Sequence, residues 1–238
     1  MGGLANIAQA SLSAAQHRLE TVAHNVANTG TAGFKAQIPF QQLLEETAAG
    51  AGGVPGALAV PEPSTYFSFD PGKLVQTGNP LDLALASAGV FILRKGEETL
   101  YSRQGQFTQD GDGRLVTGDG YVLQRAGGGD LTLSGGELRI SPEGVVFEDD
   151  QPVGKIGVAG VEDPAALKAM SGTRFAADQT LPDAEAILVR QGMVEAANVD
   201  MAAEMTRMMQ AVREAETASR IMQTYDTLIG QAITTFGS

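Results

Sequence analysis

Apolar side chains recur every three or four residues through the first part of the chain. Gln9, Ser13 and Gln16 lie off this stripe. The spacing gives a helix one narrow apolar side with a repeat close to 3.5 residues, so it predicts an N-terminal helix with a seam for another helix. Seven residues form the stripe: Ala5, Ala8, Leu12, Ala15, Leu19, Val22 and Val26.

The C-terminal part of the chain carries a second stripe with bulkier side chains. Ser219 is a polar interruption within it. The pattern predicts a final helix of roughly 35 residues. The stripe consists of Met201, Met205, Met208, Val212, Ala215 and Met222.

Neither stripe can be buried by its own helix. A lone amphipathic helix of this kind is marginal in water, so each needs a helical partner. The nearest candidate is the other end of the same chain, which predicts a coiled-coil pair, and adjacent subunits could supply further partners. Methionine is flexible and adapts to imperfect neighbours, which favours a partner surface. The alternative is that both helices pack on the middle of the chain.

The middle of the chain has the composition of a β domain. All ten prolines lie between Pro39 and Pro182, and short apolar runs alternate with Asp-Gly and Gly-Gly turn signals. We expect a mainly antiparallel β domain whose one candidate helix is Pro164–Met170. The expected strands are Leu81–Leu85, Val90–Leu93, Leu100–Phe107, Arg114–Thr117, Tyr121–Gln124, Leu131–Leu133, Leu138–Ile140, Val145–Phe147 and Lys155–Val158.

The expected fold class is therefore mixed α and β, with four segments along the chain. Residues 1–33 are the N-terminal helix and 190–238 the C-terminal helix of a helical core. Residues 34–79 form an extended arm or linker, in which 49–63 are rich in Gly, Ala and Pro, and residues 80–189 form the central β domain.

Composition and charge exclude several classes of protein. The chain has 238 residues with 28 acidic and 16 basic side chains, a formal net charge of −12, which argues against a nucleic-acid partner. No apolar run is long enough to span a membrane, and Arg18, the first basic residue, comes too late for the charged start of a secretory signal. Cysteine is absent, which excludes disulfides and thiolate chemistry.

No group of residues predicts catalysis, a metal or a cofactor. Asp110 and Asp112 suggest a calcium loop, but the position that requires a bidentate glutamate holds Tyr121. His17 and His24 stand seven residues apart, about 10 Å along a helix, too far to share one ion. The alternatives left open are a carbohydrate-active enzyme on a β scaffold and a ligand-binding β module with an unrelated coiled-coil dimer.

Several motifs resemble those of the axial proteins of the bacterial flagellum, the rod and hook group. The run 23–35 (AHNVANTGTAGFK) resembles the signature that closes their N-terminal helix, and 77–84 (TGNPLDLA) the entry to their β domain. The runs 101–107 (YSRQGQF), 112–121 (DGRLVTGDGY) and 195–200 (EAANVD) match in the same order. The motif residues are Asn25, Asn28, Thr29, Gly33, Phe34, Asn79, Pro80, Leu81, Asp82 and Asn198.

The resemblance implies a non-enzymatic structural subunit that polymerises through its terminal helices into a tube that transmits torque. It also implies export through the flagellar type III apparatus without a cleaved leader, a place in the periplasmic rod, and copies of itself and other rod proteins as partners. The run 69–78 and the single β domain are most similar to proximal-rod members, with distal-rod members second and hook subunits as a further alternative. The expected subunit contacts are Leu12, Ala15, Leu19, Val22, Val26, Met201, Met205, Met208, Val212 and Met222.

Overall fold

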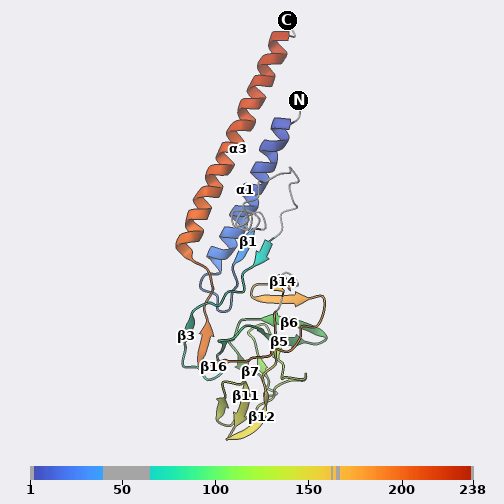
Figure 1. The fold of residues 1–238 in the computed structure, drawn as a ribbon, viewed down its shortest axis with the longest axis vertical. Helices are drawn as coiled ribbons and strands as arrows, with labels where there is room; N and C mark the ends of the chain where they lie inside the picture. The colour runs from blue at the N-terminus through green and yellow to red at the C-terminus, as the bar shows by residue number, and fades with distance from the viewer. Residues whose placement is uncertain (1–2, 40–64, 162, 165–166, 237–238) are drawn as a thin grey trace. The chain divides into compact units, whose positions relative to one another are not determined.

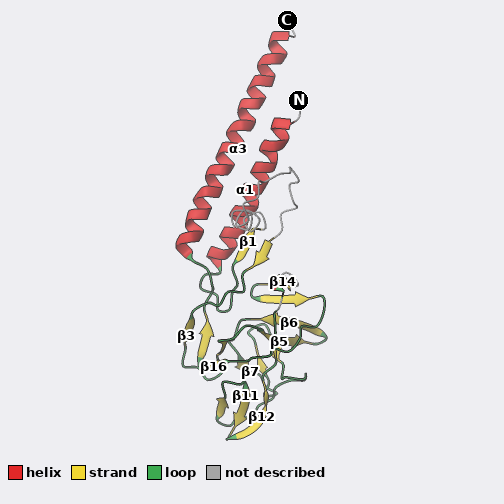
Figure 2. Cartoon of the chain, in the orientation of Figure 1, coloured by secondary structure: helices red, strands yellow, loops and turns green. Residues whose placement is uncertain are grey.

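A computed structural model describes residues 3–39, 65–161, 163–164 and 167–236 of the chain. It contains a helix at each end and short antiparallel strands between them, which confirms the expected mixed architecture (Figures 1 and 2). The predicted arm at 49–63 lies outside the described residues. The helices are α1 (Gly3–Ala27) and α3 (Met201–Phe236).

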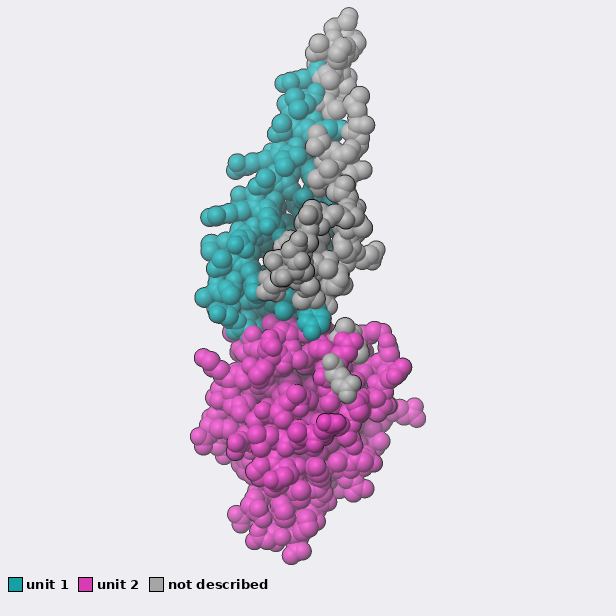
Figure 3. All heavy atoms as spheres, in the orientation of Figure 1, with its two compact units in different colours: residues 1–27, 37–66, 199–238 teal, residues 28–36, 67–198 magenta. Residues whose placement is uncertain are grey.

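The chain divides into two compact units (Figure 3). Unit 1 comprises residues 1–27, 37–66 and 199–238, and unit 2 comprises residues 28–36 and 67–198. Unit 1 thus combines segments from both ends of the sequence, as the expected helix pair requires.

Within unit 1, α3 packs along α1, and the two helices run antiparallel. The strand β1 (Gln37–Pro39) contacts α1 and pairs with β2 (Thr65–Phe67). Asp200 begins α3: its carboxylate accepts hydrogen bonds from the backbone N–H groups of Ala202 and Ala203 at 2.9 and 3.2 Å. This N-cap satisfies donors that the first helical turn leaves unpaired.

Unit 2 is built around one larger antiparallel sheet with the strand order β14-β15-β6-β5-β9-β8-β7, to which β13 adds beside β5. Its strands are β5 (Val90–Lys95), β6 (Glu98–Ser102), β7 (Thr108–Gln109), β8 (Leu115–Val116), β9 (Val122–Leu123), β13 (Val158–Ala159), β14 (Leu167–Ser171) and β15 (Arg174–Ala177).

Smaller antiparallel groups complete unit 2. A three-stranded sheet consists of β10 (Leu138–Ile140), β11 (Val145–Glu148) and β12 (Gln151–Lys155), and two pairs join β3 (Leu74–Gln76) with β17 (Met193–Glu195) and β4 (Leu83–Leu85) with β16 (Val189–Gln191). Strands β16 and β17 therefore return the end of the β region to its beginning. The main core includes Leu83, Phe91, Leu93, Phe107, Leu115 and Leu123, each no more than 1% exposed.

Three of the expected elements are wrong. The expected strand at 155–158 is divided between the end of β12 and the start of β13, and Ile156 between them makes a single bridge to Arg125. The candidate helix at 164–170 is instead largely strand β14, which pairs with β15 and buries Leu167 in a second apolar cluster. The run 131–133 forms no strand. Asp130, just before it, and Thr132, within it, make single bridges, while Leu131 and Leu133 are buried in the main core. Tertiary pairing and burial decided these three cases over local pattern.

Candidate functional site

The buried and half-buried positions of α3 form a regular seam along the helix. This seam does not coincide with the positions of its largest apolar residues. Glu204, Ala211 and Ala218 are buried, and Met208, Ala215 and Met222 are half-buried. Taken in order, these positions alternate spacings of four and three residues. On α1 the buried apolar residues are Ala8, Ala15 and Val22, seven residues apart. Small side chains on both helices let the two backbones approach closely.

The large apolar residues of α3 lie mostly outside this seam. Met201, Met205, Met209 and Val212 are 41, 44, 57 and 41% exposed. At about 100° per residue these four positions fall on one side of the helix. Ile221 and Leu228 are exposed on α3 as well. We call Met201, Met205, Met209 and Val212 the methionine flank.

The residues expected to contact other subunits therefore separate into two groups. One group lies within the helix pair: Ala15 and Val22 are buried, and Leu12, Val26, Met208 and Met222 are half-buried. The other group is exposed: Leu19, Met201, Met205 and Val212. Only the second group is exposed, at 37–44% of each residue's surface, and can contact another molecule.

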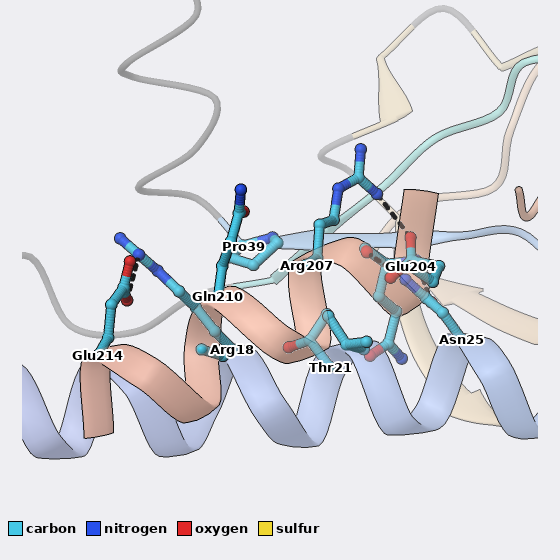
Figure 4. A pocket seen from close by; sticks show the side chains of 11 residues that line it. Arg18, Thr21, Asn25, Pro39, Glu204, Arg207, Gln210 and Glu214 are labelled. Carbon is cyan, nitrogen blue, oxygen red and sulfur yellow. Dashed lines mark hydrogen bonds and ion pairs between the residues drawn. The ribbon is translucent and has the colours of Figure 1, made fainter. Parts of the chain in front are cut away.

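Unit 1 also contains a polar cavity of about 230 Å³ between α1, α3 and β1 (Figure 4). An ion pair between Arg18 Nη1 and Glu214 Oε2 at 2.8 Å links the two helices at one end of it. At the other end Glu204 Oε1 lies 2.5 Å from Arg207 Nη1. Asn25 holds β1 beside the cavity, because its amide donates to the Gln37 carbonyl at 2.9 Å and accepts from the Gln37 N–H at 2.8 Å.

Unit 2 buries an ionic cluster around Glu195, which we call the Glu195 cluster. Glu195 Oε1 accepts hydrogen bonds from Lys35 Nζ at 2.7 Å and from the Gly72 N–H at 2.7 Å. Glu195 Oε2 accepts from Arg103 Nη1 at 3.1 Å. The side chains of Lys35, Arg103 and Glu195 are 1, 4 and 1% exposed.

Backbone carbonyls accept further hydrogen bonds from the two cations in this cluster, and only Arg103 Nε among the donors of the Arg103 guanidinium is buried without a partner. Lys35 Nζ donates to the Asp70 carbonyl at 2.6 Å, and Arg103 donates to the carbonyls of Leu85 and Ser87 at 3.0 and 2.9 Å. Burial lowers the pKa of Lys35 and of Arg103, and the Glu195 charge opposes both shifts. The cluster thereby ties together five segments of the chain, at residues 35, 70–72, 85–87, 103 and 195.

The signature residues near the N-terminal helix stop and before α3 meet in the same part of unit 2. Helix α1 ends at Ala27, as the Asn28–Gly30 stop predicts, and Gly33 adopts φ +71° with its N–H bonded to the Glu195 carbonyl at 2.7 Å. Phe34 is buried. Asn198 accepts from the Ala36 N–H at 2.7 Å and donates to the Ser68 carbonyl at 2.8 Å. These bonds fasten residues 33–36 beside residues 195–198.

The second group of signature residues forms the turn into β4. The Asn79 side chain donates to Asp82 Oδ1 at 3.0 Å and accepts from the Leu81 N–H at 3.2 Å. The Pro80 carbonyl accepts from Gln191 at 2.9 Å, and Leu81 packs against the main core. Asn28 and Thr29 lie half-buried at the turn that follows α1. The motif residues are thus structural: they shape turns and fix the ends of segments.

Nothing in the described part of the chain forms a metal centre. No three His, Asp or Glu side chains within these ranges gather around one point. Asp110 binds Arg114 at 2.8 Å and caps its own turn, as turn chemistry predicts. Neither of the two described helices has the length and apolarity that crossing a bilayer demands.

Comparison with known proteins gives matches along most of the chain. Three family profiles match: "Flagella basal body rod protein" at residues 6–35, "Flagellar hook protein FlgE/F/G D1 domain" at 84–148, and "Flagellar basal body rod FlgEFG protein C-terminal" at 190–235. They cover α1, much of the β region, and α3.

Curated relatives match over nearly their whole length. The flagellar basal-body rod protein FlgF of Mesorhizobium japonicum is 30% identical, with 98% of this chain and 97% of the relative aligned. The rod protein FlgG of Caulobacter vibrioides is 32% identical over 93% of this chain and 95% of its own length. The rod protein FlgG of Bacillus subtilis is 29% identical over 92% of this chain and 93% of its own length. The chain therefore belongs to the flagellar basal-body rod protein family, whose members are structural proteins and not enzymes.

Proposed function

We propose that this rod protein assembles through its terminal helices, which line the inner wall of a tubular rod and transmit torque, while the β region lies outward. The observation that carries this proposal is the methionine flank. A helix that has already buried one side against α1 leaves four large apolar residues exposed on another. Contact with other subunits would remove that apolar surface from water, which is favourable in proportion to the area buried.

We further propose that α1 and α3 pair as an antiparallel coiled coil. The alternating spacing of four and three residues from Glu204 to Met222 supports this pairing, as do the matching alanines of α1. In the rod, the seam would hold one chain together and the methionine flank would join neighbouring chains. Within the rod, α1 and α3 would act as the helical core and unit 2 as the outer domain.

We place the chain in the proximal rod, in the periplasm, after export through the flagellar type III apparatus. The run 69–78 supports the proximal position, as the resemblance to proximal-rod members rests on it. Relatives named FlgF and FlgG match at 30 and 32% identity, so the distal rod is the alternative. Copies of this chain and other rod proteins are the expected partners.

The test is a charge placed on the exposed apolar surface. Leu19→Asp and Met205→Asp are expected to abolish incorporation into basal bodies and swimming, because a carboxylate cannot be buried unpaired at a subunit contact. Circular dichroism and melting of the purified variants should match the unaltered chain. The matched control is Gln16→Asp, an exposed polar position of α1 off the stripe, which should assemble normally. Normal swimming by Leu19→Asp and Met205→Asp would contradict the proposal.

A further inference from the structure

The cavity in unit 1 contains an incomplete ion pair. Glu204 is 2% exposed, and its Oε1 is bound to Arg207, but its Oε2 is buried with no hydrogen-bond partner. A buried carboxylate oxygen that lacks a donor is unfavourable. Both Glu204 and Arg207 line the cavity, and the Arg207 side chain is 43% exposed, so it can rotate outward and share the carboxylate with an incoming group (Figure 4).

A cation is the donor that binds a carboxylate most strongly, and the segment that follows β1 contains none. From residue 40 to residue 64 the sequence contains no Lys, Arg or His. Unit 1 contains no lysine and four arginines. Arg18 and Arg207 already form ion pairs. Among the described residues, Arg213 and Arg220 are the exposed arginines of unit 1 without an ion pair.

The position of these two arginines prevents them from reaching Glu204 of their own chain. Arg213 lies nine residues beyond Glu204, which is about half a turn around the helix and about 13 Å along it. Arg220 lies sixteen residues beyond, about 160° around and about 24 Å along. Both therefore lie on the side of α3 away from the cavity, and a rigid helix cannot fold back on itself.

We propose that the cavity receives the guanidinium of Arg213 or Arg220 from a second copy of this chain, with Glu204 as its carboxylate partner. This inference rests on the proposed function and names one contact between neighbouring subunits. Because the cavity and the arginines occupy different faces of α3, the contact joins unlike surfaces. Such contacts do not close into a symmetric pair and can propagate as an open helical polymer.

The polar lining of the cavity suits a guanidinium. Thr21 donates its hydroxyl proton to the His17 carbonyl, which leaves its oxygen able to accept a hydrogen bond. Gln210 and Glu214 add further oxygen atoms at the cavity wall. A planar guanidinium with five N–H donors can use several acceptors at once.

The experiment is a double-mutant cycle with the full-length chain in a strain that lacks the native copy. The variants are Glu204→Gln, which keeps the side-chain volume, the exposed double variant Arg213→Gln/Arg220→Gln, and their combination. The readout is the amount of chain in purified basal bodies relative to the unaltered chain. Melting of each purified variant checks that the chain still folds.

We expect Glu204→Gln and the double arginine variant each to lower incorporation at least about tenfold, since each removes one partner of a desolvated charge pair. The combined variant should incorporate no less than the single variant with the lower incorporation, because the same pair is lost only once. Glu216→Gln, an exposed acid of α3, is the matched control and should incorporate normally.

Unchanged incorporation of the two variants, or losses that multiply in the combination, would overturn the inference and leave the proposed function standing. A loss with Glu204→Gln alone would show that neither Arg213 nor Arg220 supplies the donor, which also overturns the inference. If the unaltered chain itself is absent from basal bodies, the proposed function fails, and the inference fails with it.

Discussion

The β region and the helix pair differ in what they leave exposed to water. Unit 2 encloses a core of Leu and Phe side chains, and every carboxylate oxygen of its Glu195 cluster is paired. Unit 1 buries a seam of small residues, leaves the methionine flank exposed, and contains a carboxylate oxygen without a donor. The difference indicates that unit 2 buries its large apolar side chains within one chain, whereas unit 1 leaves apolar surface for neighbours to cover.

The largest effect on stability should come from the Glu195 cluster. Glu195→Ala leaves two buried cations without their carboxylate and is expected to cost about 3–5 kcal/mol in the free energy of unfolding of unit 2. Chemical denaturation followed by tyrosine fluorescence measures this loss, since Tyr101 and Tyr121 lie in unit 2. Glu185→Ala, at an exposed position, is the matched control and should change little. A loss for Glu195→Ala no larger than the control's would show that the cluster does not hold unit 2 together.

Truncating one large apolar side chain in each unit sharpens the comparison. Leu93→Ala removes a fully buried side chain from the core of unit 2 and is expected to cost about 2–5 kcal/mol. Met209→Ala on the methionine flank should cost less than about 0.5 kcal/mol in the free chain, because that side chain is already in water. For assembly into basal bodies the order of the two effects should reverse. Met209→Ala should lower incorporation more than Leu93→Ala does. Equal losses of stability in the free chain would contradict the distinction between the units.

A smaller loss is expected at the turn after α1. Gly33 has φ +71°, and a Cβ there would lie 2.3 Å from the Gln104 nitrogen. Gly33→Ala should cost about 1–3 kcal/mol, since an L side chain disfavours this backbone conformation. Gly111→Ala, where no atom lies within 4 Å of the added Cβ, serves as the control in a thermal melt. A tolerated Gly33→Ala would mean that this turn does not require glycine.

The smallest expected effect is a loss of stability of unit 2 at acid pH. The backbone N–H groups of Ser134 and Gly136, together with that of Gly135, lower the pKa of Glu148 below its ordinary 4.5. The unfolded chain therefore binds the proton first, so the stability of unit 2 falls as pH drops from about 5 toward 3. Glu148→Gln should flatten this dependence, while Glu97→Gln in an exposed turn should not. Parallel slopes for Glu148→Gln and the unaltered chain would rule out Glu148 as a source of the acid sensitivity.

Sequence pattern predicted the terminal helices, the antiparallel middle and the helix stop at Asn28. It did not separate the inward side of α3 from the outward side. Hydrophobicity selects Met201, Met205 and Val212, but the positions that bury against α1 are Ala211 and Ala218, because a small side chain allows close approach. Which side of a helix faces its partner depends on the partner's shape, and the stripe does not contain that information.

The Glu195 cluster could not be predicted from the sequence either. Lys35, Arg103 and Glu195 each lie within a signature run, yet 160 residues separate Lys35 from Glu195. Long-range pairing of this kind follows from the strand pairs that return β17 to β3. The sequence shows the three signature runs, but it does not show that their side chains form one buried ionic cluster.

The central claim is that neighbours complete unit 1 and not unit 2. Amide hydrogen exchange on the purified chain and on the same chain in isolated basal bodies tests it most directly. We expect the amides of α1 and α3 to exchange quickly in the free chain and to become strongly protected after assembly, while the core strands β5 and β6 stay protected in both. Equal protection of α1 and α3 before and after assembly would contradict the claim.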